Sequence, residues 1–110
     1  MDKILGMLGM AKKAGKVTSG VYLCEKAIKT GESSLIVIAA QASENTKKSI
    51  IDSCKYYNVE YVEYSDMDTL GKCIGGGKKA VVSVNDKSFA AAIKQKFCRI
   101  VERNGENVSF

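Results

Sequence analysis

Residues 34–40 form a continuous apolar segment, SLIVIAA, which limits the possible folds of the chain more than any other feature. A short apolar run that includes branched residues is typical of a strand buried on both faces. Residues 80–84, AVVSV, have the same character. Strands of this kind need helices above and below their sheet, so the two segments predict a sheet that is covered on both sides.

Segments with helical and strand patterns alternate along the chain. Helices are predicted at residues 2–14, at 21–30, after Ser43, after Asp66 or Asp68, and after Asn85 or Asp86. Strands are predicted at residues 16–19, 34–40, 59–64 and 80–84. We therefore predict an α/β fold, a single-domain three-layer α/β/α sandwich with a central mixed sheet of about four strands.

One domain accounts for the length of the chain, because 110 residues without a linker or repeat are enough for one core. We assign residues 1–102 to this domain and the polar residues 103–110 to a C-terminal tail. No apolar run approaches the roughly 18 residues of a membrane span, and residues 1–14 do not have the pattern of a secretory signal. We expect a cytoplasmic protein that does not enter a membrane.

Charge is distributed unevenly along the chain, whose formal net charge is +5. Residues 1–31 carry six lysines against two acidic residues, and residues 71–99 carry seven basic residues against one acidic residue. Residues 56–70 carry four acidic residues and no basic one. Segregated charge can attract a polyanion to one face, although an ordinary solvated surface can have the same composition. Charge alone therefore leaves both interpretations open.

The residues that most active sites and zinc sites require are scarce. Histidine, the usual acid–base residue near neutral pH, is absent from the sequence. The four cysteines lie far apart among apolar or helix-periodic neighbours, at Cys24, Cys54, Cys73 and Cys98. We interpret them as reduced core residues and not as zinc ligands. We accordingly expect no enzyme activity, no metal and no cofactor.

The predicted helix 21–30 has features that suit an anionic ligand. Tyr22, Lys26 and Lys29 are spaced i, i+4, i+7, so they share one exposed face. Free backbone N–H groups at the start of the helix add to the attraction for a negative charge. Exposed lysine and tyrosine are also common on helices without a ligand, and Glu25 can pair with Lys29.

The stretch GKCIGGGKK, residues 71–79, resembles a phosphate-binding loop only superficially. A P-loop needs a glycine six residues before its lysine and a serine or threonine after it, whereas Lys72 and Lys79 stand at these positions relative to Lys78. Bare glycine amides next to lysines can still approach a phosphate backbone closely. A flexible connection without a ligand is the alternative interpretation.

Four segments together match the pattern of a known family: LGMAKKAGKVTSG (8–20), KAIKTG (26–31), SLIVIAAQASENTKK (34–48) and LGKCIG (70–75). With them the chain resembles the kink-turn RNA-binding ribosomal proteins of the L-seven-Ae / L-thirty-e type, in particular the short bacterial members of the YlxQ type. The resemblance extends over residues 2–98. It implies an α/β/α sandwich that binds structured RNA without a cofactor.

The resemblance also implies where RNA would bind, namely at the start of the second helix and at the loop before the last strand. Gly20 stands where the family has the glycine that opens this helix, and Lys26 where it has a lysine that meets the RNA. Tyr22 and Leu23 replace the Asn-Glu pair that usually reads tandem sheared G·A pairs, and Gly76 replaces a branched apolar residue. The predicted RNA-binding residues are Lys16, Gly20, Val21, Tyr22, Lys26, Lys29, Lys47, Ile74, Gly75, Gly76, Gly77 and Lys78.

Three functions follow from these observations. The first is a non-enzymatic RNA-binding protein that is ribosome-associated or binds structured, kink-turn-like RNA, with ribosome or ribonucleoprotein components as further partners. The alternative is a protein-interaction module on the same fold that has lost specific RNA readout, in which Tyr22 and Leu23 contribute to an apolar contact. The third is a small-ligand or enzymatic α/β domain, against which the missing histidine argues.

Overall fold

Helices and strands alternate along the chain in the computed structural model, which describes the backbone of residues 3–104 and the side chains of residues 3–97. The elements are α1 (Lys3–Lys13), β1 (Val17–Ser19), α2 (Val21–Thr30), β2 (Leu35–Ile38), α3 (Glu44–Tyr57), β3 (Tyr61–Glu63), α4 (Met67–Cys73), β4 (Val81–Val84) and α5 (Lys87–Asn104). Where the sequence predicts both bounds of an element, they agree with the structure to within two residues.

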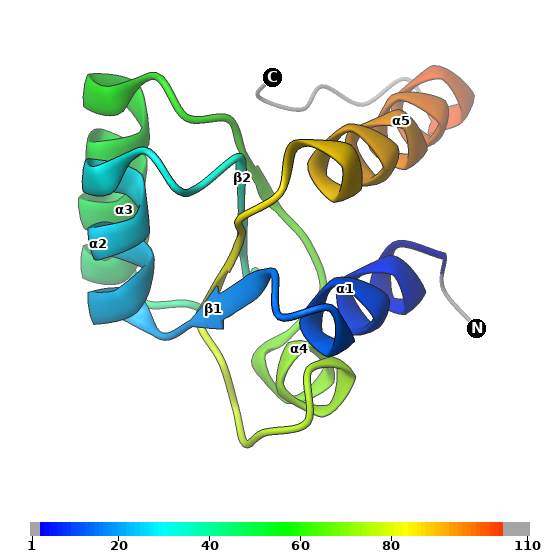
Figure 1. Cartoon of the computed structure of the whole chain (residues 1–110), viewed down its shortest axis with the longest axis horizontal. Coiled ribbons are helices and arrows are strands. Elements are labelled where there is room, and N and C mark those ends of the chain that lie inside the picture. Colours follow the sequence, from blue (N-terminus) through cyan, green and yellow to red (C-terminus); the bar gives the residue numbers. More distant parts are fainter. Residues whose placement is uncertain (1–2, 105–110) are drawn as a thin grey trace.

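The four strands form one mixed sheet in the order β1-β4-β2-β3, in which β4 is antiparallel to β1 and β2, and β2 is parallel to β3. Helices α2 and α3 cover one face of the sheet, and α1, α4 and α5 lie on the other (Figure 1). The predicted α/β/α sandwich with a mixed sheet is therefore confirmed. All residues of the central strands β2 and β4 are buried, which explains why their sequences lack a polar alternation.

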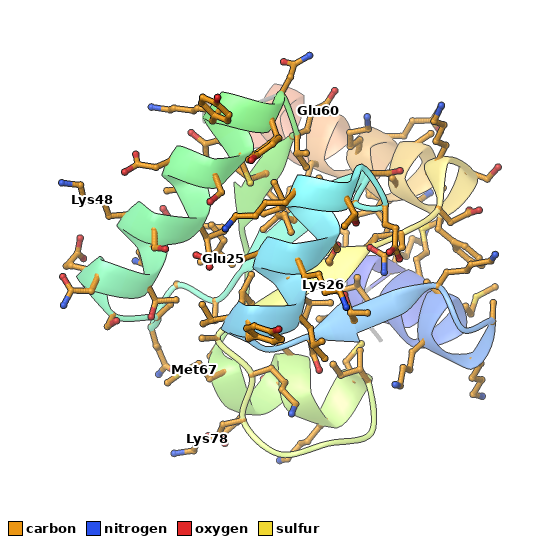
Figure 2. All side chains as sticks on the ribbon, turned by 60° about the vertical axis from the view of Figure 1, so that its left-hand side comes forward. Glu25, Lys26, Lys48, Glu60, Met67 and Lys78 are labelled. Atoms are coloured by element: carbon orange, nitrogen blue, oxygen red, sulfur yellow. The ribbon has the colours of Figure 1, made fainter. Side chains whose placement is uncertain are left out.

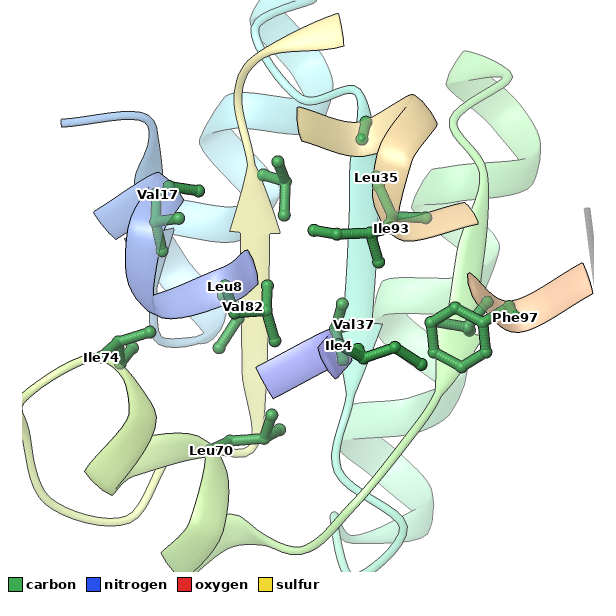
Figure 3. Packing of buried hydrophobic residues seen from close by; sticks show 14 of the residues in the cluster. Ile4, Leu8, Val17, Leu35, Val37, Leu70, Ile74, Val82, Ile93 and Phe97 are labelled. Atoms are coloured by element: carbon green, nitrogen blue, oxygen red, sulfur yellow. The ribbon is translucent and has the colours of Figure 1, made fainter. Parts of the chain in front are cut away.

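Alternate residues of the central strands point into two separate cores. Leu35, Val37 and Val82 face α1, α4 and α5, where Ile4, Leu8 and Leu70 pack against them (Figure 3). The second core, toward α2 and α3, contains Cys24, Ile28, Ile36, Ile38, Ala42, Ile50, Cys54 and Val81. Cys24 and Cys54 are thus core residues as predicted, Cys73 is half-buried, and the side chain of Cys98 lies outside the described residues.

Side-chain caps mark the starts of α3, α4 and α5. The Ser43 hydroxyl accepts a hydrogen bond from the Thr46 N–H at 3.1 Å, and Asp66 accepts one from the Thr69 N–H at 2.7 Å. The backbone and hydroxyl hydrogen bonds from Thr69 lower the pKa of Asp66. Of the two candidates for α5 it is Asp86 that accepts from the helix, from the Phe89 N–H at 2.9 Å. The predicted cap of α1, Asp2, lies outside the described residues.

Helix α5 continues to Asn104, so the predicted boundary between residues 102 and 103 falls inside this helix. Residues 105–110 of the predicted tail lie outside the described part of the chain. Among residues 3–104, no helix combines the length and the apolar character that crossing a membrane would need.

Candidate nucleic-acid interface

The pairing of β1 with β4 brings the start of α2 next to residues 74–80, which we call the glycine loop. Ser19 lies opposite Val82, and the Gly20 N–H donates a hydrogen bond to the Val81 carbonyl at 3.0 Å. The chain therefore enters α2 at the point where the glycine loop enters β4. Figure 2 shows α2 standing directly above the loop that bears Lys78. Two segments that are far apart in the sequence thus form one surface.

The start of α2 leaves its first-turn amides uncapped. Gly20 is the N-cap residue with φ 92° and ψ 150°, a backbone conformation that is essentially restricted to glycine. Because this residue has no side chain, it supplies no cap to the N–H groups of residues 21–23, at the positive end of the helix dipole. This end of α2 therefore favours a negatively charged group.

One face of α2 is open to solvent above these amides. Tyr22 is 77% exposed, and Lys26 and Lys29 are exposed beside it, so the three residues share a face as their spacing predicts. Glu25 instead turns toward α3, where its carboxylate accepts a hydrogen bond from the Ser49 hydroxyl. The positive charges of the two lysines consequently face solvent next to an aromatic ring.

The glycine loop closes over α4 because residue 71 has no side chain. An ideal Cβ on Gly71 would lie 2.6 Å from the carbonyl carbon of Gly77, which is closer than real Cβ contacts allow. The Gly76 N–H donates to the Gly71 carbonyl at 2.8 Å, and the Lys79 N–H donates to the Met67 carbonyl at 3.1 Å. These hydrogen bonds tie both ends of the loop to α4.

Sequence reasoning missed Gly71 as a residue that shapes the interface. A signal was present, since a glycine within a helix of seven residues lowers helix stability by about 1 kcal/mol relative to alanine. Such a loss is tolerated where another backbone segment approaches closely. The approaching segment, the backbone of Gly77, cannot be identified without the tertiary structure.

The remaining loop residues predicted to bind RNA differ in exposure. Gly75, Gly76, Gly77 and Lys78 are exposed, with Gly75 in the left-handed conformation at φ 79°. The Ile74 side chain is only 6% exposed and packs in the core shared with α1 and α4. Ile74 therefore anchors the loop, and its side chain is not available at the surface.

Two of the predicted lysines stand apart from this surface. Lys16 precedes β1, where its carbonyl accepts from the Asn85 N–H at 2.7 Å, so it lies about 13 Å along the strand from Gly20. Lys47 is on α3 and its Nζ lies 3.1 Å from a carboxylate oxygen of Glu63. The structure does not bring Lys16 to the start of α2, and the charge of Lys47 is offset by an acidic neighbour.

The described cysteines of the second core are in no position to act as nucleophiles. Burial is the main reason that the pKa of Cys24 and that of Cys54 rise from the ordinary value of 9.0 to about 12. The proximity of Cys54 raises the pKa of Cys24 further. Within the described residues, no three His, Cys, Asp or Glu side chains gather as a metal site would require.

We expect Cys24 and Cys54 to resist iodoacetamide in the folded protein at pH 8 and to react once urea unfolds it, because only the thiolate attacks. Peptide mapping by mass spectrometry identifies each labelled cysteine. Labelling of Cys24 and Cys54 as fast as Cys73 in native buffer would contradict their burial.

The same raised pKa values affect stability at high pH. Between pH 9 and about 12 the unfolded chain binds fewer protons than the folded one, so the free energy of unfolding should fall as the pH rises through this window.

Known proteins resemble the chain over most of its length. The model of the ribosomal protein L7Ae/L30e/S12e/Gadd45 family matches residues 2–94. The RNA-binding protein YlxQ of Bacillus subtilis (strain 168) is 39% identical over 84 residues, which cover 76% of this chain and 84% of that protein. The RNA-binding protein YlxQ of Enterococcus faecium is 32% identical over 94 residues, covering 86% and 90%.

A solved structure with a similar fold is the 15.5kD RNA binding protein of Giardia lamblia. It superposes with a TM-score of 0.75 and covers 92% of each chain. The sequence identity between the two is 18%, so the likeness concerns the fold.

Proposed function

Because the chain belongs to the ribosomal protein L7Ae/L30e/S12e/Gadd45 family, we propose that it is a non-enzymatic RNA-binding protein. The names of the two YlxQ relatives support RNA as the ligand. The observation that carries the proposal is the β1–β4 pairing, which sets the uncapped start of α2 beside the exposed glycine loop. We further propose that the protein acts in the cytoplasm together with ribosome or ribonucleoprotein components.

The proposed surface would hold a sharply bent RNA from two sides. Phosphate oxygens would accept hydrogen bonds from the first-turn amides of α2 and from the amides of the glycine loop. Lys26, Lys29 and Lys78 would add positive charge on either side of these amides. The exposed ring of Tyr22 would stack on an unpaired base. Phosphate contacts from α2 and from the glycine loop favour RNA whose backbone bends between the two segments. Stacking on Tyr22 favours RNA in which a base is unpaired.

Hydrogen bonds to base edges would contribute less to RNA binding by this protein than the contacts with phosphates. Leu23 is 48% exposed and offers no donor or acceptor on its side chain, and Tyr22 offers one hydroxyl. Tandem sheared G·A pairs would therefore find few polar side chains at the start of α2. We propose that the protein recognises the bent shape of a kink-turn-like RNA more than the sequence of its G·A pairs.

The neighbouring exposed side chains Tyr22 and Leu23 favour one alternative function. Together they form a small apolar surface at the start of α2, and such a surface can serve as the centre of a protein contact. A protein-interaction module without specific RNA readout would use this same surface. The two functions differ in whether RNA binds near physiological salt.

We expect Lys26→Ala to weaken binding to kink-turn RNA by about fivefold and to reduce the salt dependence by about one counterion, because one phosphate contact is lost. Lys55→Ala is the matched control, since Lys55 is an exposed lysine in the last turn of α3 and does not belong to the proposed RNA-binding surface. Titrations of labelled kink-turn RNA, a ribosomal RNA fragment and an unstructured RNA at two salt concentrations measure both effects. Equal binding of all three RNAs by both variants would argue against a specific site.

A further inference from the structure

A cleft of about 660 Å³ lies between α1 and α4. Both helices are on the side of the sheet opposite α2 and α3 (Figure 1). Its apolar walls include Leu5 and Met10 of α1, together with Cys73 and Ile74 at the end of α4. The volume is within the range of about 300–1,000 Å³ that is common for binding pockets. Among the described residues that line the cleft, Ile74 and Gly75 also belong to the glycine loop of the proposed RNA-binding surface.

Direct contacts between the two helices hold the cleft in shape. The Cys73 thiol donates a hydrogen bond to the Leu5 carbonyl at 2.8 Å. On the next turn of α1, a Cβ on Gly9 would lie 3.3 Å from the Cys73 carbonyl oxygen, so the helices approach each other closely there. Gly6 and Gly9, which also line the cleft, have no side chains to fill it, and this contributes to the hollow. The shape of the cleft is thus fixed by the contacts between α1 and α4.

The side chains around the cleft combine apolar surface with positive charge. Met10 is 60% exposed and Leu5 is half-buried, so apolar atoms remain open to solvent. Lys12 and Lys13 at the end of α1 and Lys72 of α4 also line the cleft. No acidic residue is among the described residues that line it. A complementary ligand therefore has apolar groups flanked by carboxylates.

We propose that this cleft docks an acidic amphipathic helix of a partner protein. A groove between two helices is a common receptor for the apolar face of a third, and the flexible thioether of Met10 can adapt to its side chains. Glutamate or aspartate beside the apolar face would meet Lys12, Lys13 and Lys72. RNA fits less well, because the described residues that line the cleft include no aromatic ring on which a base could stack.

The proposed partner can bind while RNA occupies the other surface. Most residues that line the cleft belong to α1 and α4, with Ile74 and Gly75 contributed by the start of the glycine loop. Lys26 and Tyr22 lie on α2 in the opposite helical layer. Binding of the peptide should therefore be unaffected by Lys26→Ala. This independence makes the failure of one proposal distinguishable from the failure of the other.

The test uses the full chain labelled with 13C at its methionine methyl groups. The probe is a synthetic helical peptide of about 15 residues with leucines at i, i+3, i+4 and i+7 and glutamates at the flanking positions. We expect the Met10 methyl resonance to shift to saturation while the Met67 methyl, which is half-buried in the core, stays unchanged. A shuffled peptide of the same composition should produce no saturable shift.

Charge reversal then tests the basic residues around the cleft. We expect Lys13→Glu to weaken peptide binding by about tenfold, since it replaces an attraction by a repulsion. Lys3→Glu makes the same change of charge on an exposed residue of α1 outside the cleft, and it should change the affinity by less than about twofold. Equal weakening by both variants, equal binding of the shuffled peptide, or saturation of Met10 by kink-turn RNA alone would overturn the proposal.

Discussion

Gly71→Ala is expected to displace the glycine loop and to weaken RNA binding more than the removal of any one lysine. An alanine Cβ at this buried position would lie 2.6 Å from the Gly77 carbonyl carbon and 3.2 Å from the Gly76 carbonyl oxygen. Both contacts are with backbone atoms, so a change of side-chain rotamer cannot relieve them. We expect the free energy of unfolding, measured with urea, to fall by about 3 kcal/mol.

Gly77→Ala is the matched control for this loop. An ideal Cβ on Gly77 meets no heavy atom within 4 Å, and its φ lies outside the left-handed region. The control should therefore change the free energy of unfolding by less than about 0.5 kcal/mol. If Gly71→Ala were as stable as Gly77→Ala and bound RNA as well as the unchanged protein, the close approach of the glycine loop to α4 would not be what holds the loop in position.

Gly20→Ala should have the second-largest effect. The φ of 92° and ψ of 150° at Gly20 are unfavourable for any residue with a Cβ, so we expect a loss of about 2 kcal/mol in the free energy of unfolding. No heavy atom lies within 4 Å of an ideal Cβ, so the loss comes from the backbone conformation and not from a clash. To relieve the strain, the chain would change its direction into α2 and move the first-turn amides, which should also lower RNA affinity.

The other end of the same helix provides a comparison for Gly20→Ala. Gly31 follows the last turn of α2 in the left-handed conformation, with φ 82° and ψ 6°. Gly31→Ala should lower the free energy of unfolding by about 1 kcal/mol, but it leaves the start of α2 in place. RNA titrations at a temperature where both variants are folded separate the two effects. An equal loss of RNA affinity in both variants would indicate general destabilisation.

Local patterns were sufficient to predict the helices and strands of this protein. The largely apolar segments 34–40 and 80–84 contain the central strands, because both faces of such a strand must be covered. Ser43 caps its helix as predicted, and of the two predicted candidates Asp66 and Asp68 it is Asp66 that caps α4, since a cap depends only on residues within one turn. The exposed face formed by Tyr22, Lys26 and Lys29 likewise follows from helical spacing.

Predictions about the candidate interface were less complete, because exposure and pairing depend on distant residues. Ile74 appears in a glycine-rich segment, yet its side chain is buried against α1 and α4. Lys47 belongs to a basic cluster in the sequence, yet Glu63, on another element, pairs with it. Glu25 lies within reach of Lys29 along the helix, yet it bonds to Ser49 of α3. In each case the deciding neighbour comes from a different element.

The sequence by itself determined the order of helices and strands, the α/β class, and an uncapped helix start at Gly20, because these depend on spacing and on local caps. Only the tertiary structure decided that β4 lies between β1 and β2, which places α2 beside the glycine loop. It also decided that Gly71 receives the backbone of Gly77 and that α1 and α4 enclose a basic cleft. The physical reason is that strand order and close backbone approach are set by packing between segments far apart in the chain.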